Sequence, residues 1–161
     1  MQRTLPLLLV GLFACGGASA EIEGTAGGVA WSDSSWVYVG ARYIVISDIE
    51  LDCRDADWVE SNYDEGVAPT DIDVTVLQFA FPSSESVSTG RSAISQGGQA
   101  EATIVNLAGD VFHEYPATSG TLDVDSVEED ESATGSFESV TFEDGTLSGS
   151  FTAEWCVNLK P

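Results

Sequence analysis

The chain has 161 residues, in which 27 Asp and Glu residues outnumber 5 Lys and Arg residues and give a formal net charge of −22. A surface this negative repels nucleic-acid phosphate, so we exclude nucleic-acid binding, and the same repulsion disfavours direct adsorption of the domain to anionic lipid headgroups. The hydrophobic fraction of 43% is too high for a disordered acidic tail, and the length suits one domain with a leader.

The first twenty residues differ in kind from the rest. Residues 5–14 form an apolar run that is too short to span a bilayer and has the length of a signal-peptide core. The run ends in the sequence LFAC, which resembles the bacterial lipobox, the motif whose cysteine is lipidated. We therefore expect residues 1–20 to be a lipoprotein leader and tether, with Cys15 as the lipidation site. Gly16, the residue after this cysteine, resembles the pattern of outer-membrane sorting.

A second processing route remains open, because residues 18–20 (ASA) form a good A-x-A cleavage site for ordinary secretion. Cleavage there would release a soluble periplasmic or extracellular protein that begins at Glu21. Both routes export the chain, and no later stretch has the length of a membrane span. Residues 21–161 are expected to form a single domain.

Export gives the remaining cysteines a role. Because Cys15 is either lipidated or removed, Cys53 and Cys156 are left as one pair in an oxidising compartment. We predict a Cys53–Cys156 disulfide, which closes a loop of about 100 residues and contributes roughly 4 to 5 kcal/mol. Two free buried thiols would be the alternative.

The apolar pattern of the domain is typical of β-strands almost throughout. Strands are expected at residues 36–39, 43–46, 102–107 and 111–115. Residues 71–81 also alternate, but their apolar positions change phase, which predicts a β-bulge near 76–77.

An acidic loop is expected at residues 48–70. It carries eight carboxylates within 18 residues, namely Asp48, Glu50, Asp52, Asp55, Asp57, Glu60, Asp64 and Glu65. The first positions of a calcium loop are matched at Asp55 and Asp57, but Glu60 stands where the turn glycine belongs, so the segment is not an EF-hand. A solvated, self-repelling loop and a weak calcium site are the two interpretations.

The C-terminal third predicts a meander of antiparallel strands. Residues 147–155 alternate between apolar and polar without a phase error, as a half-buried strand does. A hairpin is expected at Asp144-Gly145, whose two-residue loop would place Phe142 opposite Leu147. Three similar segments recur at intervals of 15 and 14 residues, which is the length of one strand plus one turn: SGTL at 119–122, TGSF at 134–137 and SGSF at 148–151.

Several of these features occur together in one known group. A lipobox-like leader is followed by a strand that runs into Ser47-Asp48 shortly before a cysteine, and the SGTL, TGSF and SGSF strands are closed by Trp155-Cys156. The chain thereby resembles the small exported all-β lipoproteins that are numerous in some Gram-negative bacteria. The resemblance implies a compact β-fold with a disulfide, and it implies no activity.

The side chains that usually carry chemistry are sparse. His113 is the only histidine, and Pro116 prevents the helix that a zinc-protease motif needs, so we expect an ordinary strand histidine. With one histidine and no free cysteine in the mature chain, the usual zinc sites and catalytic Cys–His pairs are also excluded. Since 27 acidic residues supply many carboxylate pairs, a hydrolase with two carboxylates across a cleft is a remote alternative. We expect no catalytic residue, metal or cofactor.

Tryptophans offer another route to binding. Trp31, Trp36 and Trp58 are candidates for an exposed platform that stacks on sugars, whereas Trp155 lies on the apolar face and is expected in the core. A calcium- or carbohydrate-binding module that uses residues 48–65 and Trp58 is therefore the alternative function.

The expected fold is an antiparallel β-sandwich of about eight strands, with a curved, partly closed β-barrel as the alternative. The expected function is that of a non-enzymatic envelope lipoprotein. It would be anchored in the membrane through Cys15 and would present an acidic β-domain in a structural or binding role.

Overall fold

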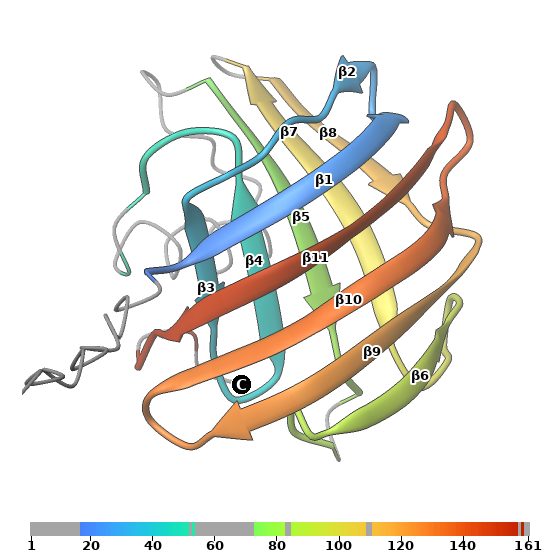
Figure 1. Ribbon diagram of the computed structural model, residues 1–161. Helices are drawn as coiled ribbons and strands as arrows, with labels where there is room; N and C mark the ends of the chain where they lie inside the picture. Colours follow the sequence, from blue (N-terminus) through green and yellow to red (C-terminus); the bar gives the residue numbers. More distant parts are fainter. Residues whose placement is uncertain are drawn as a thin grey trace, which may run out of the picture.

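The computed structural model describes residues 17–51, 53, 73–82, 85–108, 111–157 and 159. Eleven β-strands form the framework of this part of the chain, which confirms the all-β class that the alternating pattern predicts (Figure 1). The strands are β1 Ser19–Ala26, β2 Val29–Ala30, β3 Trp36–Val39, β4 Tyr43–Ser47, β5 Val74–Ala80, β6 Gly90–Ile94, β7 Glu101–Ala108, β8 Val111–Pro116, β9 Ser119–Glu128, β10 Ser132–Thr141 and β11 Thr146–Trp155.

All eleven strands belong to one sheet. Their order is β6-β9-β10-β11-β3-β4-β5-β7-β8, with β1 paired to β11 and β2 paired to β1. The pairing of β3 with β11 is parallel, whereas the neighbouring pairs β10–β11 and β3–β4 are antiparallel, so the sheet is mixed.

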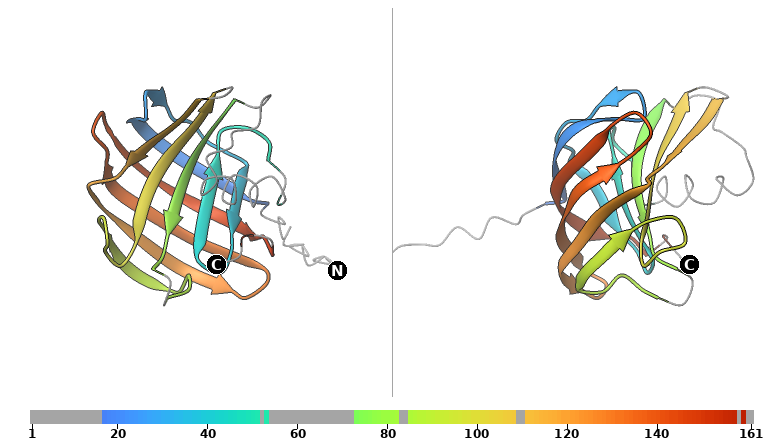
Figure 2. Two further views of the ribbon diagram at one scale, coloured as in Figure 1. Left: turned by 180° about the vertical axis from the view of Figure 1, so that it is seen from behind. Right: turned by 90° about the vertical axis from the view of Figure 1, so that its right-hand side faces the viewer.

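The sheet curls strongly into a half-barrel. One wall consists of β1, β11, β10 and β9, and the facing wall consists of β4, β5, β7 and β8 (Figure 2). Because β3 joins β11 to β4, the two walls are parts of one sheet rather than two packed sheets. The expected antiparallel sandwich of about eight strands therefore needs correction, and the curved, partly closed alternative is nearer to the structure. Twist that accumulates over many strands curls a sheet in this way.

The main hydrophobic core fills the space between the two walls. Phe79 of β5 and Phe137 of β10 meet across it, with ring centroids 5.2 Å apart. Their exposed fractions are 0% and 1%. Val37, Ile104 and Leu147 belong to the same cluster, so strands from both walls contribute to a single core.

A second, smaller cluster lies on the outer face of the wall that contains β4, β5 and β7. Its buried members are Val45, Leu51, Val74, Val76, Val105, Leu107, Cys156 and Leu159. The chain after β11 packs closely here, because a Cβ added to Gly40 would lie 2.3 Å from the Cβ of Leu159. One wall is therefore covered by apolar side chains on both faces.

This double burial explains the phase change in β5. Val74 and Val76 belong to the outer cluster, whereas Leu77 and Phe79 belong to the main core. The strand pairs with β4 and β7 without a register shift, so the predicted β-bulge near 76–77 is wrong. Apolar residues simply move from the outer face to the inner face along a regular strand.

The predicted meander is confirmed, since β9, β10 and β11 are consecutive antiparallel neighbours. The register also gives the repeated Gly-x-Phe pattern a physical role. Gly135 lies opposite Phe151, and Phe137 lies opposite Gly149. A Cβ added to Gly149 would lie 2.8 Å from the Phe137 ring, and a Cβ added to Gly135 would lie 2.8 Å from the Phe151 ring. Each glycine thus makes room for the ring on the neighbouring strand.

The β10–β11 hairpin forms at the predicted place but in a different register. Val140, rather than Phe142, lies opposite Leu147, and the loop contains the four residues 142–145. A register shift also occurs further along β10, between Phe137 and Val140, where Ser139 has a φ of 52°.

The tip of this hairpin is fastened to the turn between β1 and β2. The Asp144 carboxylate accepts hydrogen bonds from the backbone N–H groups of Gly27 at 3.0 Å and Gly28 at 2.7 Å. Both glycines have positive φ, 65° and 76°, which turns successive amides toward one anion. These hydrogen bonds stabilise the charged carboxylate and hold the pKa of Asp144 below its ordinary value. The bond from Gly27 has the larger effect, and the bond from Gly28 comes next.

Candidate functional site

The predicted disulfide is present, with the Cα atoms of Cys53 and Cys156 5.5 Å apart and 103 residues between them in sequence. Cys156 is fully buried in the outer cluster, and Cys53 packs against that cluster. The bond therefore ties the segment after β4 to the segment after β11.

Most of the other predicted site residues lie outside the described part of the chain. This holds for Cys15 and, within the acidic loop, for Asp52 and residues 54–70, which include Trp58. The start of that loop is described. The Asp48 side chain accepts a hydrogen bond from the Thr75 backbone N–H at 2.8 Å, and the Asp48 N–H donates to the Thr75 carbonyl at 3.1 Å. Asp48 thus extends the pairing of β4 with β5.

His113 is an exposed residue of the edge strand β8, where it lies opposite Asn106. The centroid of its ring lies 6.4 Å from that of Tyr115. The expectation of a strand histidine is met. Over the described ranges, no group of three His, Cys, Asp or Glu side chains is arranged to hold a metal ion.

The tryptophans do not assemble as an exposed platform in the described residues. Trp31 is only 9% exposed, and its indole N–H donates to the Ala26 carbonyl at 3.2 Å, so this candidate does not belong to an exposed platform. Trp155 packs against the main core, as predicted, and is half-buried. Trp36 is also half-buried.

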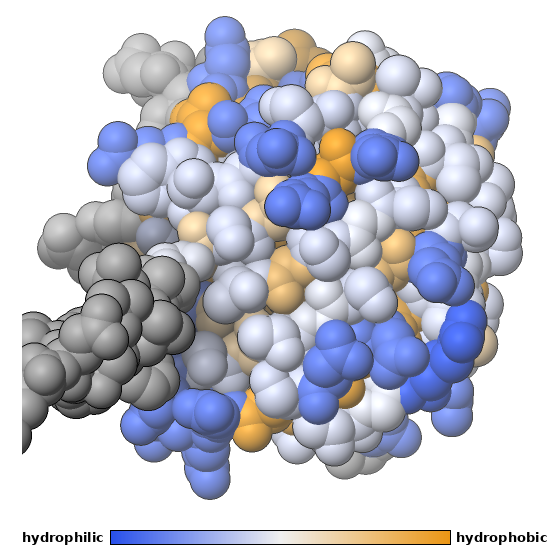
Figure 3. Space-filling view, viewed as in Figure 1, coloured by the Kyte–Doolittle hydropathy of each residue, from blue (hydrophilic) through white to orange (hydrophobic). Residues whose placement is uncertain are grey.

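Small hydroxyl side chains dominate the outer face of the other wall. Thr152 and Thr134 lie opposite each other on β11 and β10, and Ser150 lies opposite Ser136. Two shallow hollows of about 400 and 330 Å³ lie over this face, and both are lined by Ser150 and by the Glu21 carboxylate. Figure 3 shows this face as mostly pale, with scattered strongly hydrophilic groups. It is a polar surface with few large side chains.

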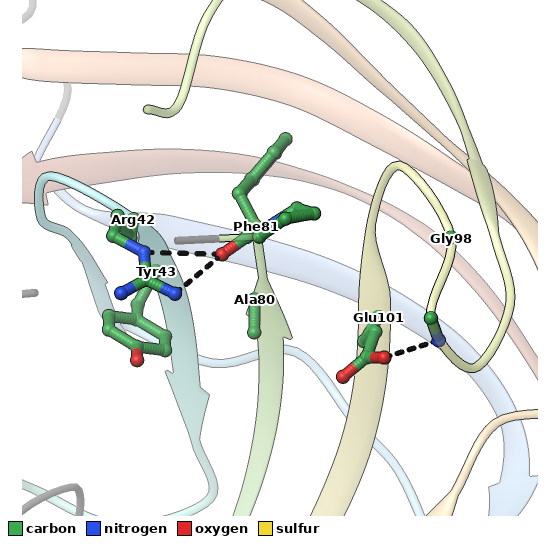
Figure 4. A pocket seen from close by; sticks show the side chains of 8 residues that line it. Arg42, Tyr43, Ala80, Phe81, Gly98 and Glu101 are labelled. Carbon is green, nitrogen blue, oxygen red and sulfur yellow. Dashed lines mark hydrogen bonds between the residues drawn. The ribbon is translucent and has the colours of Figure 1, made fainter. Parts of the chain in front are cut away.

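A more defined hollow, of about 290 Å³, lies at the end of the opposite wall and was missed by sequence reasoning (Figure 4). Its residues come from the start of β4, the end of β5, the start of β7 and the turn before β7. They are Arg42, Tyr43, Ala80, Phe81, Pro82, Gly97, Gly98 and Glu101. Arg42 is one of only five Lys and Arg residues in a strongly acidic chain, and this scarcity is the signal that could have directed attention to this place.

Arg42 is held firmly at this hollow. Its Nε and Nη2 atoms donate to the Phe81 carbonyl at 3.2 and 3.0 Å, and its guanidinium carbon lies 5.6 Å from the centroid of the Tyr43 ring. Across the hollow, the Glu101 carboxylate accepts a hydrogen bond from the Gly97 backbone N–H. The site therefore presents one fixed cation and one fixed anion.

Comparisons with known proteins add no assignment to these observations. No helix within the described ranges has the length and apolar character needed to cross a bilayer. The chain matches no family model, no curated protein and no solved structure.

Proposed function

We propose that the protein is an exported bacterial lipoprotein whose β-domain is anchored in the outer membrane through Cys15 and has a structural or binding role without catalysis. The observation that carries this proposal is where β1 begins. Its first residues, Ser19 and Ala20, lie opposite Thr152 and Phe151 of β11. Ala20 is only 2% exposed.

Ala20 is also fixed from its other side. Its backbone N–H donates to the Ser34 carbonyl at 2.6 Å, and its carbonyl accepts from the Ser34 N–H at 2.8 Å. Cleavage after Ala20 would remove both hydrogen bonds and leave Glu21 as a charged terminus within the sheet. Since each such bond contributes about 0.5 to 1.5 kcal/mol, the loss would be roughly 1 to 3 kcal/mol. Cleavage before Cys15 retains the whole strand, which supports the lipoprotein route.

The same geometry makes the link to the membrane short. Ala18 packs against the main core, and its N–H lies 3.4 Å from a carboxylate oxygen of Glu154. Only Gly16 and Gly17 then separate the docked chain from Cys15, and an extended chain reaches roughly 10 Å over that distance. Two or more acyl chains anchor a protein stably. The net charge of −22 repels the rest of the domain from anionic headgroups.

A non-enzymatic role fits the environment of the Asp144 carboxylate. A general acid needs a raised pKa, whereas the backbone amides of Gly27 and Gly28 lower the pKa of Asp144. Asp144 is therefore suited to fastening two turns rather than to proton transfer.

The test is metabolic labelling with palmitate in a Gram-negative host that produces the full chain. We expect label on the wild-type protein in the membrane fraction and none on Cys15→Ser. Cys53→Ala should keep the label, because this cysteine belongs to the disulfide, and it serves as the matched control. Unlabelled wild-type protein in the soluble fraction would refute the anchor.

A further inference from the structure

The hollow at Arg42 owes its shape to a row of three residues on neighbouring strands. Tyr43 of β4 lies opposite Ala80 of β5, and Ala80 lies opposite Glu101 of β7. Directly opposed residues point to the same face of a sheet, so the short Ala80 side chain forms a low floor between two long ones. Because neighbouring strands lie about 4.8 Å apart, the backbones that carry the two walls are roughly 10 Å apart. The volume of about 290 Å³ suits a small ligand.

The two charged groups on these walls are fixed before any ligand arrives. The two bonds from Arg42 to the Phe81 carbonyl leave further guanidinium N–H donors, since an arginine side chain has five. Within the described residues Arg42 forms no ion pair; the ion pair found there joins Arg91 to Glu138. The guanidinium and the Glu101 carboxylate stand on either side of Ala80 (Figure 4).

Charge decides which ligand suits this arrangement. A free anion is repelled by a chain of net charge −22, and a simple cation is repelled by the guanidinium of Arg42. A molecule that carries one positive and one negative charge has no net charge, so the chain does not repel it at long range. Its two charged groups can pair with Arg42 and Glu101. We propose that this hollow binds a small zwitterion, a free amino acid or dipeptide, with its carboxylate on Arg42 and its ammonium on Glu101. This inference goes beyond the proposed function and is independent of the lipid anchor.

The experiment is isothermal titration calorimetry of the oxidised protein with glycine, β-alanine and glycylglycine, which differ in the separation of their charges. We expect a Kd in about the millimolar range for at least one of them. Blocking the amine by acetylation, or converting the carboxylate to the amide, should each weaken that ligand about tenfold, because one charged hydrogen-bonded pair is lost.

The protein variants provide the matching half of the test. Arg42→Gln should abolish the difference between the acid and its amide, and Glu101→Gln should abolish the difference between the free and the acetylated amine. Arg91→Gln, which removes an exposed arginine elsewhere, should bind like the wild type. If Arg42→Gln fails to fold, Glu101→Gln and the blocked ligands on the wild type still decide the matter.

Three results would overturn the proposal. They are the absence of binding for all three zwitterions at concentrations of about 50 mM, equal binding of the blocked and unblocked ligands by the wild type, and weakened binding by Arg91→Gln. The palmitate label is unaffected by any of these results, so the two proposals fail separately.

Discussion

Breaking the Cys53–Cys156 disulfide should lower the free energy of unfolding by about 4 to 5 kcal/mol. The two cysteines are 103 residues apart in sequence, so the bond closes a long loop in the unfolded chain. In the chain-entropy model, closing a loop of this length restricts the unfolded chain at a cost of about 4.7 kcal/mol at 25 °C. The folded state holds both cysteines at the outer cluster, where Cys156 is fully buried.

Urea denaturation followed by tryptophan fluorescence measures this difference. Reduced wild-type protein and the double variant Cys53→Ala/Cys156→Ala should show the same loss, because the unfolded chain is opened in both. In a thermal melt the loss corresponds to a decrease in Tm of roughly 8 to 20 °C. Wild-type protein that has been reduced and then re-oxidised is the matched control and should melt like the untreated wild type, since its disulfide is restored.

A loss of less than about 1 kcal/mol in both experiments would refute the reasoning, because ring closure would then contribute little. A large loss in the double variant with a small loss on reduction would also contradict it. That pattern would assign the stability to the packing of the sulfur atoms rather than to the covalent link.

Three further predictions concern the sheet. Gly149→Ala should destabilise the domain by about 1 to 3 kcal/mol in urea denaturation, because the new Cβ would lie 2.3 Å from a backbone oxygen and 2.8 Å from the Phe137 ring. Gly17→Ala is the control and should leave the stability unchanged, because no atom lies within 4 Å of its added Cβ. Phe137→Ala should cost about 3 to 5 kcal/mol by leaving a cavity between the two walls, and a loss below about 1 kcal/mol would contradict the description of the core. Since the folded pKa of Asp144 is lowered, its contribution to stability is present above the ordinary carboxyl pKa and is lost as the pH falls through the folded value. Asp144→Asn should therefore flatten the acid side of the curve of unfolding free energy against pH. An unchanged curve would contradict a stabilising role for the hydrogen bonds from Gly27 and Gly28 to Asp144.

Local alternation and cysteine counting predicted much of this fold. The strand at 147–155 needed no tertiary information, because one of its faces is buried and the other is exposed along its length. The disulfide was predicted from two cysteines and the expectation that the chain is exported to an oxidising compartment. The Gly-x-Phe repeats marked the meander, although their reciprocal pairing became clear only with the register.

The failures come from contacts that are distant in sequence. The phase change in β5 looks like a bulge until Leu159 and Cys156 are seen to cover the outer face. The hairpin has a four-residue loop rather than a two-residue one, and Asp144 of this loop is bound by the turn between β1 and β2. Likewise, the hollow at Arg42 brings together strand ends that are far apart along the chain. A single sequence does not show which distant segments come into contact in this way.

The most direct test of the central claim is the intact mass of the mature N-terminus, measured on protein purified from the envelope of a Gram-negative host. The account predicts that the first residue is Cys15 and that it carries acyl chains, so that Ser19 and Ala20 remain in β1. An unmodified protein that begins at Glu21 would contradict the account, because the chain would then lack the start of the strand on which the anchor proposal rests.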